Sequence, residues 1–261
     1  MSAIVVIPAR YSSTRFPGKP LALLRGTPVI EHVYRNSLNS RLVDEVIVAT
    51  DSEMIFEKVL SFGGKAVMTS PAHVSGTDRI AEVARDLRYD IIVNVQGDEP
   101  LIRPEMIDDV VSVLDDRRAS IGTLAKRIDT RSEIFDPNIV KVAFDKEGFA
   151  LYFSRAPIPY HRDLFCAGGQ LNPCPSADLP GGGTSELFMF KHVGIYSYRR
   201  DVLLRLTECE PSRLEMVEKL EQLRALENNL RIKVRETLFE TVGVDTPEDL
   251  ERIEKCLNSS L

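Results

Sequence analysis

The sequence predicts an α/β fold with a mostly parallel, mixed sheet and helices on both of its faces. Short, strongly apolar runs such as residues 4–7 and 91–95 are typical of strands buried on both sides. Stretches with helical spacing lie between these runs, and this alternation favours parallel strands joined by right-handed helical crossovers. The 261 residues can bury the core of one domain or of two closely joined ones.

Each element of the first half follows from its local pattern. Apolar runs predict strands at 4–7, 45–50, 65–68 and 91–95. Helical spacing predicts helices at 29–38, at 53–62 before a Gly-Gly pair, at 77–87, and at 105–114 after a proline. We expect Thr77 and Asp78 to cap the third of these helices.

The second half changes character, because its strand-like runs are separated by long connections. These runs are 139–144, 150–153, 192–198 and 231–234. An apolar stripe predicts one long helix over about 213–228, and a last helix should start near Asp245. Residues 165–185 are rich in Gly, Pro and Ser, so we expect either a mobile lid or a disordered loop.

Composition narrows the class of protein. A hydrophobic content of 43%, a charged content of 28% and a net charge of −6 are typical of a globular protein and disfavour a general nucleic-acid binder. We see no signal peptide, and no apolar run approaches the roughly 18 residues of a membrane helix. Cys166 and Cys174 could bridge or bind a metal, but free cytosolic thiols are favoured. We therefore expect a cytoplasmic protein that does not insert into membranes.

The loop after the first strand has the sequence PARYSSTRFPGKP at 8–20. Its cations Arg10, Arg15 and Lys19 are set among small residues that allow tight turns. Ligands of open α/β sheets bind outside the carboxyl ends of the strands. A triphosphate suits such a loop, because its oxygens require several donors and compensating charge. The alternative is a solvated basic loop.

Chain topology places this loop on the same rim as the loop after residues 91–95, so its cations should face Asp98. The first loop is not a P-loop, because Lys19 is followed by Pro20 rather than by Ser or Thr. The G-x-G-x-x-G pattern is also missing after the strands of this sequence. Hydride transfer to a nicotinamide is therefore disfavoured.

The loop at 8–20 resembles the signature loop of sugar nucleotidyltransferases. Three further motifs, VNVQGDEP at 93–100, YFSRAPIP at 152–159 and GVDTPEDL at 243–250, narrow the resemblance to the CMP-Kdo synthetase family, where Kdo is 3-deoxy-manno-octulosonate. The resemblance covers residues 4 to about 253, except for 165–185. It implies a Rossmann-like nucleotidyltransferase sheet with a smaller sugar-binding and dimerisation elaboration.

The resemblance implies that CTP and Kdo give CMP-Kdo and diphosphate, by in-line attack of the anomeric hydroxyl on the α-phosphorus. Arg10, Arg15, Lys19 and Asp98 would be the catalytic residues. Asp98 and Asp245 would bind Mg²⁺, a hard cation that takes carboxylate, phosphate and water oxygens. For Asp245, a helix cap is the alternative.

The resemblance also implies two sets of binding residues. Gln96 can read a base edge through its amide, and Thr77 could contact the nucleotide while it also caps a helix. The set implied for CTP is Pro8, Ala9, Arg10, Arg15, Lys19, Gly76, Thr77, Arg79 and Gln96. The set implied for the sugar is Arg155, Arg162, His192, Tyr196, Glu215 and Gln222. A structural role for His192, a core position for Tyr196 and a solvated helix face for Glu215 or Gln222 are the alternatives.

The organisation that follows is a single nucleotidyltransferase domain over 1–261. Residues from 1 to about 130 would bind the nucleotide, and about 131–240 would bind the sugar and form a homodimer. Residues 241–261 would bring a metal-binding loop back to the nucleotide site and end in a last helix. A CMP-sialic acid synthetase-like enzyme and a catalytically silent nucleotide-binding regulator are the alternative functions. The silent regulator is disfavoured, because the expected cations and carboxylates are all present.

Overall fold

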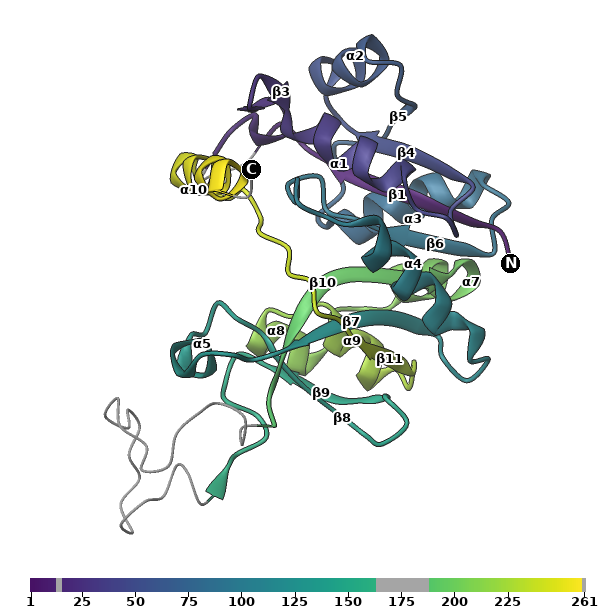
Figure 1. Cartoon of the computed structure of the whole chain (residues 1–261). Coiled ribbons are helices and arrows are strands. Elements are labelled where there is room, and N and C mark those ends of the chain that lie inside the picture. The colour runs from purple at the N-terminus through teal and green to yellow at the C-terminus, as the bar shows by residue number, and fades with distance from the viewer. Residues whose placement is uncertain (13–15, 163–187, 260–261) are drawn as a thin grey trace.

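Strand β1 (Ala3–Ala9) lies inside the sheet, and all 7 of its residues are buried. The computed structural model describes residues 1–12, 16–162 and 188–259. In the described residues the main sheet has nine strands, in the order β11-β7-β10-β6-β1-β4-β5, with β8 and β9 attached beside β10. Strands β6, β1, β4 and β5 are parallel, and β10 runs antiparallel to both β6 and β7. The predicted mostly parallel, mixed sheet is confirmed (Figure 1).

The element bounds agree closely with the sequence pattern in the first half. The strands are β2 (Leu23–Leu24), β3 (Thr27–Pro28), β4 (Glu45–Thr50), β5 (Ala66–Met68), β6 (Ile91–Asn94), β7 (Ile121–Arg127), β8 (Lys141–Phe144), β9 (Ala150–Ser154), β10 (Phe190–Arg199) and β11 (Ile232–Glu236). The helices are α1 (Val29–Leu38), α2 (Glu53–Ser61), α3 (Gly76–Asp86), α4 (Pro104–Ser112), α5 (Arg131–Phe135), α7 (Arg200–Glu208), α8 (Arg213–Glu218), α9 (Gln222–Glu227) and α10 (Pro247–Ser259). Two short 3-10 helices, η1 (Lys19–Leu21) and η2 (Val113–Asp115), complete the described set.

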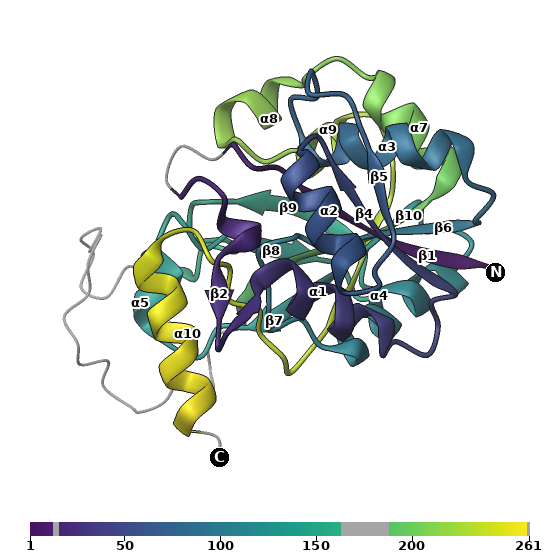
Figure 2. The same ribbon diagram turned by 90° about the horizontal axis from the view of Figure 1, so that it is seen from above.

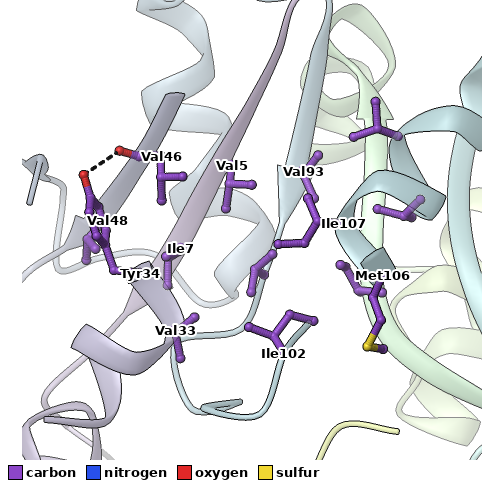
Figure 3. Packing of buried hydrophobic residues seen from close by; sticks show 14 of the residues in the cluster. Val5, Ile7, Val33, Tyr34, Val46, Val48, Val93, Ile102, Met106 and Ile107 are labelled. Atoms are coloured by element: carbon purple, nitrogen blue, oxygen red, sulfur yellow. Dashed lines mark hydrogen bonds between the residues drawn. The ribbon is translucent and has the colours of Figure 1, made fainter. Parts of the chain in front are cut away.

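Apolar side chains alternate between the two faces of β1, because successive residues of a strand point to opposite sides. Val5 and Ile7 pack with α1, α2 and α4, whereas Ile4 and Val6 pack with α3 and α7. Figure 2 shows these helix layers on opposite sides of the sheet. Figure 3 shows the first layer, in which the Tyr34 hydroxyl donates to the carbonyl oxygen of Val46 at 3.2 Å.

Strand β7 and helix α7 were not predicted. The apolar run of β7 is interrupted by Gly122 and Thr123, so its sequence lacks the signal of a buried strand. Gly122 is required by packing, because a Cβ there would lie 2.5 Å from Oγ of Ser197 on β10. Packing against β10, rather than the local sequence pattern, therefore requires glycine at position 122.

The prediction of one long helix over 213–228 is wrong, because the structure has two short helices there. Lys219 adopts a left-handed conformation (φ 56°) and separates α8 from α9. The predicted stripe does not form one buried face, since Val217 is 81% exposed while Leu223 is fully buried. The Arg224 side chain bonds back to Glu215 across the break, which stabilises the turn.

The predicted cap of α3 is displaced by two residues. Ser75 is the N-cap, because its hydroxyl accepts from the Asp78 amide and the Asp78 carboxylate accepts from the Ser75 amide. Thr77 therefore lies inside the first turn with its side chain buried.

Helix α10, near the end of the chain, lies beside elements from its beginning. Both ribbon views place it beside β2 and β3 (Figures 1 and 2), and the Arg25 amide donates to Glu254 at 2.8 Å. The loop predicted at 165–185, which includes Cys166 and Cys174, lies outside the described residues. Among the helices that the structure describes, none has the length and apolar composition needed to cross a membrane.

Candidate active site

A cavity of about 300 Å³ opens at the carboxyl ends of β1 and β6. Its lining comes from the loop after β1, the start of α3, the turn after β6 and the segment before α10. The residues predicted for this rim that line the cavity are Pro8, Ala9, Arg10, Lys19, Gly76, Arg79, Gln96, Asp98 and Asp245. The fold thus brings together loops that are distant in the sequence. Arg15 lies outside the described residues.

Lys19 is held at the centre of the rim. Gly18 precedes it in a left-handed conformation (φ 72°), and the Gly18 amide donates to the Tyr11 carbonyl at 2.9 Å. The Lys19 ammonium contacts the Asp98 carboxylate and lies 3.2 Å from Oδ1 of Asp245. The predicted contact between the loop cations and Asp98 is therefore confirmed for Lys19.

Asp245 is not the cap of α10. The Thr246 hydroxyl accepts from the Asp249 amide, and Asp249 accepts from the amides of Asp245 and Thr246. These bonds form a capping box around Thr246. The Asp245 side chain instead faces Lys19 and the cavity.

The two aspartates have the donor chemistry that a magnesium ion requires. Mg²⁺ is commonly bound through one or two carboxylates, together with substrate phosphates and waters. Among the described residues, His, Cys, Asp and Glu side chains do not gather in groups of three or more that could hold a metal. A carboxylate pair beside an open cavity fits a metal shared with a phosphate substrate.

The opposite wall of the cavity is formed by α3 and the segment before it. A Cβ at Gly76 would lie 3.3 Å from Cγ of Pro8, so glycine allows these loops to approach each other. Arg79 is 4% exposed and donates to Asp51 at 2.7 Å and to the Thr69 hydroxyl. Its guanidinium therefore also holds the wall together.

His73 lines the same wall and was missed in the sequence. Its Nε2 contacts the Glu82 carboxylate, which also accepts from the Ser70 amide at 3.0 Å. The hydrogen bond from His73 holds the pKa of Glu82 below its ordinary value. A histidine six residues before an arginine has no distinctive pattern, so the sequence offered no signal for it.

A second cavity of about 160 Å³ adjoins the first, and Gln96 lines both. Of the predicted residues, Thr77, Gln96, Tyr196 and Gln222 line this second cavity. The Gln96 amide donates to Oδ1 of Asn94 at 3.0 Å, which positions it at the junction. The shared residue Gln96 therefore links the two cavities into one candidate site.

Glu221 is the acidic group of the second cavity, and the sequence analysis missed it. Burial raises the pKa of its carboxyl. Its buried Oε1 has no hydrogen-bond partner in the part of the chain that the structure describes. Lys, Arg and His are absent from the described lining. Hydroxyl groups of a ligand would satisfy this carboxyl better than an anion would.

The other residues predicted for the sugar lie outside the described lining of this cavity. Arg155 donates to the carbonyls of Pro137 and Glu218, both at 2.8 Å. Glu215 forms a two-point ion pair with Arg224. Arg162 is exposed. These contacts give Arg155 and Glu215 structural partners.

His192 packs against two aromatic rings, one of which, Tyr196, lines the second cavity. Its ring centroid lies 5.2 Å from those of both Phe153 and Tyr196, and its Nε2 lies 2.9 Å from the Thr123 hydroxyl. Burial lowers the pKa of His192 to about 3, so the imidazole is neutral near pH 7. A neutral ring can shape the wall beside Tyr196 but does not provide positive charge.

Comparison with known proteins identifies similar sequences over nearly the whole chain. A family model described as cytidylyltransferase matches residues 4–232. A 3-deoxy-manno-octulosonate cytidylyltransferase of Thermodesulfovibrio yellowstonii is 52% identical over 267 residues, covering 99% of each chain. One of Geotalea daltonii is 53% identical over 256 residues, covering 97% of each.

Solved structures agree with these sequence matches. A CMP:2-keto-3-deoxy-manno-octonic acid synthetase complexed with CTP superposes with a TM-score of 0.87 at 41% identity, and the match covers 100% of both chains. A 4-diphosphocytidyl-2C-methyl-D-erythritol synthase from Anaerococcus prevotii has a TM-score of 0.61 at 12% identity, which shows a shared fold.

Proposed function

Because this chain belongs to the cytidylyltransferase family, we propose that it is the enzyme that converts CTP and Kdo into CMP-Kdo and diphosphate. The product is the activated sugar used for lipopolysaccharide synthesis. Relatives about half identical over nearly their full length carry this activity in their names. The observation that carries the proposal is the Lys19 ammonium between Asp98 and Asp245, at the mouth of a cavity beside β1.

The first cavity would hold CTP. Pro8, Ala9, Gly76 and Gln96 would surround the nucleoside, and Arg79 and Thr77 would support that wall. Arg10, Arg15 and Lys19 would hold the triphosphate, since phosphate oxygens are satisfied best by several cationic donors. Gln96 can both donate to and accept from a base edge.

The reaction requires positioning and charge neutralisation rather than a protein nucleophile. The anomeric oxygen of Kdo forms a bond to the α-phosphorus, and its proton passes to solvent. The bond from the α-phosphorus to the oxygen that bridges to the β-phosphorus breaks, and diphosphate leaves. Arg10, Arg15 and Lys19 would stabilise the charge that develops on the departing oxygens.

Asp98 and Asp245 would hold Mg²⁺, which neutralises phosphate charge when it is bound. In the free protein, Lys19 offsets part of the negative charge of the two carboxylates that it contacts. The same ammonium would then be placed next to the triphosphate. These two roles of Lys19 would explain why a lysine and two aspartates meet in the lining of the first cavity.

The second cavity would take the polyol end of Kdo. Glu221, Gln222 and Tyr196 provide groups that bond to hydroxyls, and Gln96 connects them to the nucleotide cavity. The sugar carboxylate would point towards cations at the mouth, among which Arg10 lines the first cavity. Arg155, Arg162, His192 and Glu215 would then act from the surrounding wall rather than by direct contact in the described arrangement.

We further propose the division of the chain into nucleotide-binding residues 1–130, sugar-binding and dimerisation residues 131–240, and the returning segment 241–261. Exposed apolar side chains on the second half support a homodimer, since Leu151 is 64%, Met216 52% and Val217 81% exposed. We place the reaction in the cytoplasm, where CTP is available.

The test is diphosphate release with CTP, Kdo and Mg²⁺, compared with reactions that lack each component in turn. The proposal predicts release in the complete mixture alone, and little release when ATP replaces CTP. Turnover with sialic acid in place of Kdo would favour the alternative CMP-sialic acid synthetase-like function. Binding of CTP without diphosphate release would favour the silent regulator.

A further inference from the structure

The segment that connects β11 to α10 has no regular structure of its own. Residues 237–246 contain no helix or strand, and Figure 1 shows them crossing the molecule between those two elements. Where the segment begins, the Thr237 amide donates to the Ala125 carbonyl at 2.9 Å. Near its end, the Val244 amide donates to the Asp98 carbonyl at 2.8 Å. Between these two bonds the segment has no backbone ladder to set its path, so side-chain contacts matter there.

Three lysines lie side by side across the strands β7, β10 and β8. Lys191 on β10 is paired directly with Lys126 of β7 and with Lys141 of β8. Directly opposite residues of antiparallel strands project to the same face, and like charges at such positions are destabilising. Lys141 is fully buried and Lys191 is only 6% exposed, so solvent screens this row poorly. The lysines therefore need partners from other parts of the chain.

Acidic side chains from two other segments provide partners for this row. Lys191 donates to the carboxylates of Glu133 and Glu240, and Lys126 donates to the second oxygen of Glu240 at 3.0 Å. Lys141 donates to two backbone carbonyls. Burial alone would lower the pKa of Lys191, but its bonds to the two glutamates raise it above the usual value. Glu240 thus bridges two neighbouring lysines, with one carboxylate oxygen on each.

This bridge attaches the middle of the segment to the sheet. Glu240 follows the bond at Thr237 and precedes the bond at Val244. It therefore limits how far the residues before Val244 can open. Asp245, the proposed metal ligand, comes directly after that point and faces Lys19.

We propose that Glu240 is a positioning residue for the metal site. By bridging the two lysines it fixes the segment to β7 and β10, and the segment then holds Asp245 opposite Asp98. This inference rests on the metal role of these aspartates in the proposed function. Residues that orient a metal ligand affect metal affinity although they do not touch the metal.

The experiment compares Glu240→Gln and Lys191→Met with Glu236→Gln. Gln keeps the size of Glu240 but has one acceptor oxygen, so it cannot accept from both ammonium groups. Glu236 is an exposed residue at the end of β11 and loses the same charge, so its variant is the matched control. Mn²⁺ binding to the CTP-loaded protein without sugar is measured by electron paramagnetic resonance. Hydrogen exchange of residues 240–245 is measured on the metal-free protein, where it reports local opening.

Glu240→Gln and Lys191→Met should each weaken Mn²⁺ binding by roughly fivefold and speed exchange over 240–245, because the bridge is broken from either side. The two substitutions change the net charge in opposite directions, so charge alone would make Lys191→Met bind Mn²⁺ more tightly. Glu236→Gln should match the wild type in both measurements. Glu240→Gln keeps the inference testable if the buried Lys191→Met variant does not fold, since the Glu240 side chain is half-exposed.

Unchanged Mn²⁺ affinity in Glu240→Gln would overturn the inference, as would unchanged exchange over 240–245 or tighter Mn²⁺ binding by Lys191→Met. Absence of Mn²⁺ binding by the CTP-loaded wild type would also overturn it, together with the metal role of the two aspartates.

The outcome is separable from that of the proposed function. If the wild type releases diphosphate from CTP and Kdo but Glu240→Gln binds Mn²⁺ normally, the positioning role is wrong and the function stands. If the wild type releases no diphosphate but the variants lose Mn²⁺ affinity, the positioning role stands and the function is wrong.

Discussion

The Nζ of Lys19 lies 3.2 Å from Oδ1 of Asp245, although 226 positions separate the two residues in the sequence. The same ammonium contacts Asp98, so one cation joins the first loop, the turn after β6 and the segment before α10. The side chain of Lys19 is 16% exposed. Its position is therefore determined by its partners rather than by solvent.

Lys19→Ala should lower kcat by roughly 10²-fold or more, because it removes an electrostatic donor from the phosphate site. Steady-state diphosphate release measures the effect. Lys58→Ala is the matched control, since Lys58 is exposed on α2. A Lys19→Ala enzyme as active as the control would show that Lys19 serves folding alone.

Asp245→Asn should weaken Mg²⁺ activation strongly and leave the free energy of unfolding nearly unchanged, because Thr246 and Asp249 cap α10. Thr246→Ala should do the reverse and destabilise the protein by about 1 kcal/mol through loss of the cap. Activity against Mg²⁺ concentration and urea unfolding separate the two effects. Asp98→Asn should behave like Asp245→Asn, and full activity of either would contradict the metal assignment.

Glu221→Gln should raise the KM for Kdo by roughly tenfold, because a charge-assisted hydrogen bond is worth about 1.4 kcal/mol or more. The KM for CTP should change little. Glu215→Gln is the comparison, since Glu215 pairs with Arg224 in the structure. That variant should lose stability and keep its KM for Kdo. An unchanged KM for Kdo in Glu221→Gln would exclude the second cavity as the polyol site.

His192 should make unfolding pH-dependent. Its pKa is lowered from 6.5 to about 3 by burial. The unfolded chain therefore binds a proton as the pH falls below about 6.5, whereas the folded protein does not until about 3, so this contribution to stability is lost on acidification. The difference in unfolding free energy between the wild type and His192→Gln should shrink between about pH 7 and pH 4.5 in urea titrations. A constant difference would show that the ring titrates normally.

Much of the first half could be predicted, because its elements carry their own signals. Helix α1 and strand β4 were predicted with their observed bounds, since apolar periodicity and flanking polar residues coincide there. The helix over 213–228 was wrongly predicted because a left-handed Lys219 has no sequence signature. The bond from Arg224 to Glu215 stabilises this turn only after the chain has folded back.

The sequence by itself determined the parallel strands β1, β4, β5 and β6, the rim loops and the meeting of Lys19 with Asp98, because strand patterns and the handedness of crossovers constrain where loops lie. Tertiary structure alone decided which acidic residues face a cavity. Glu221 borders the second cavity, whereas Glu215 pairs with Arg224. These glutamates look alike in the sequence, since the role of a carboxyl depends on burial and on partners brought from distant segments.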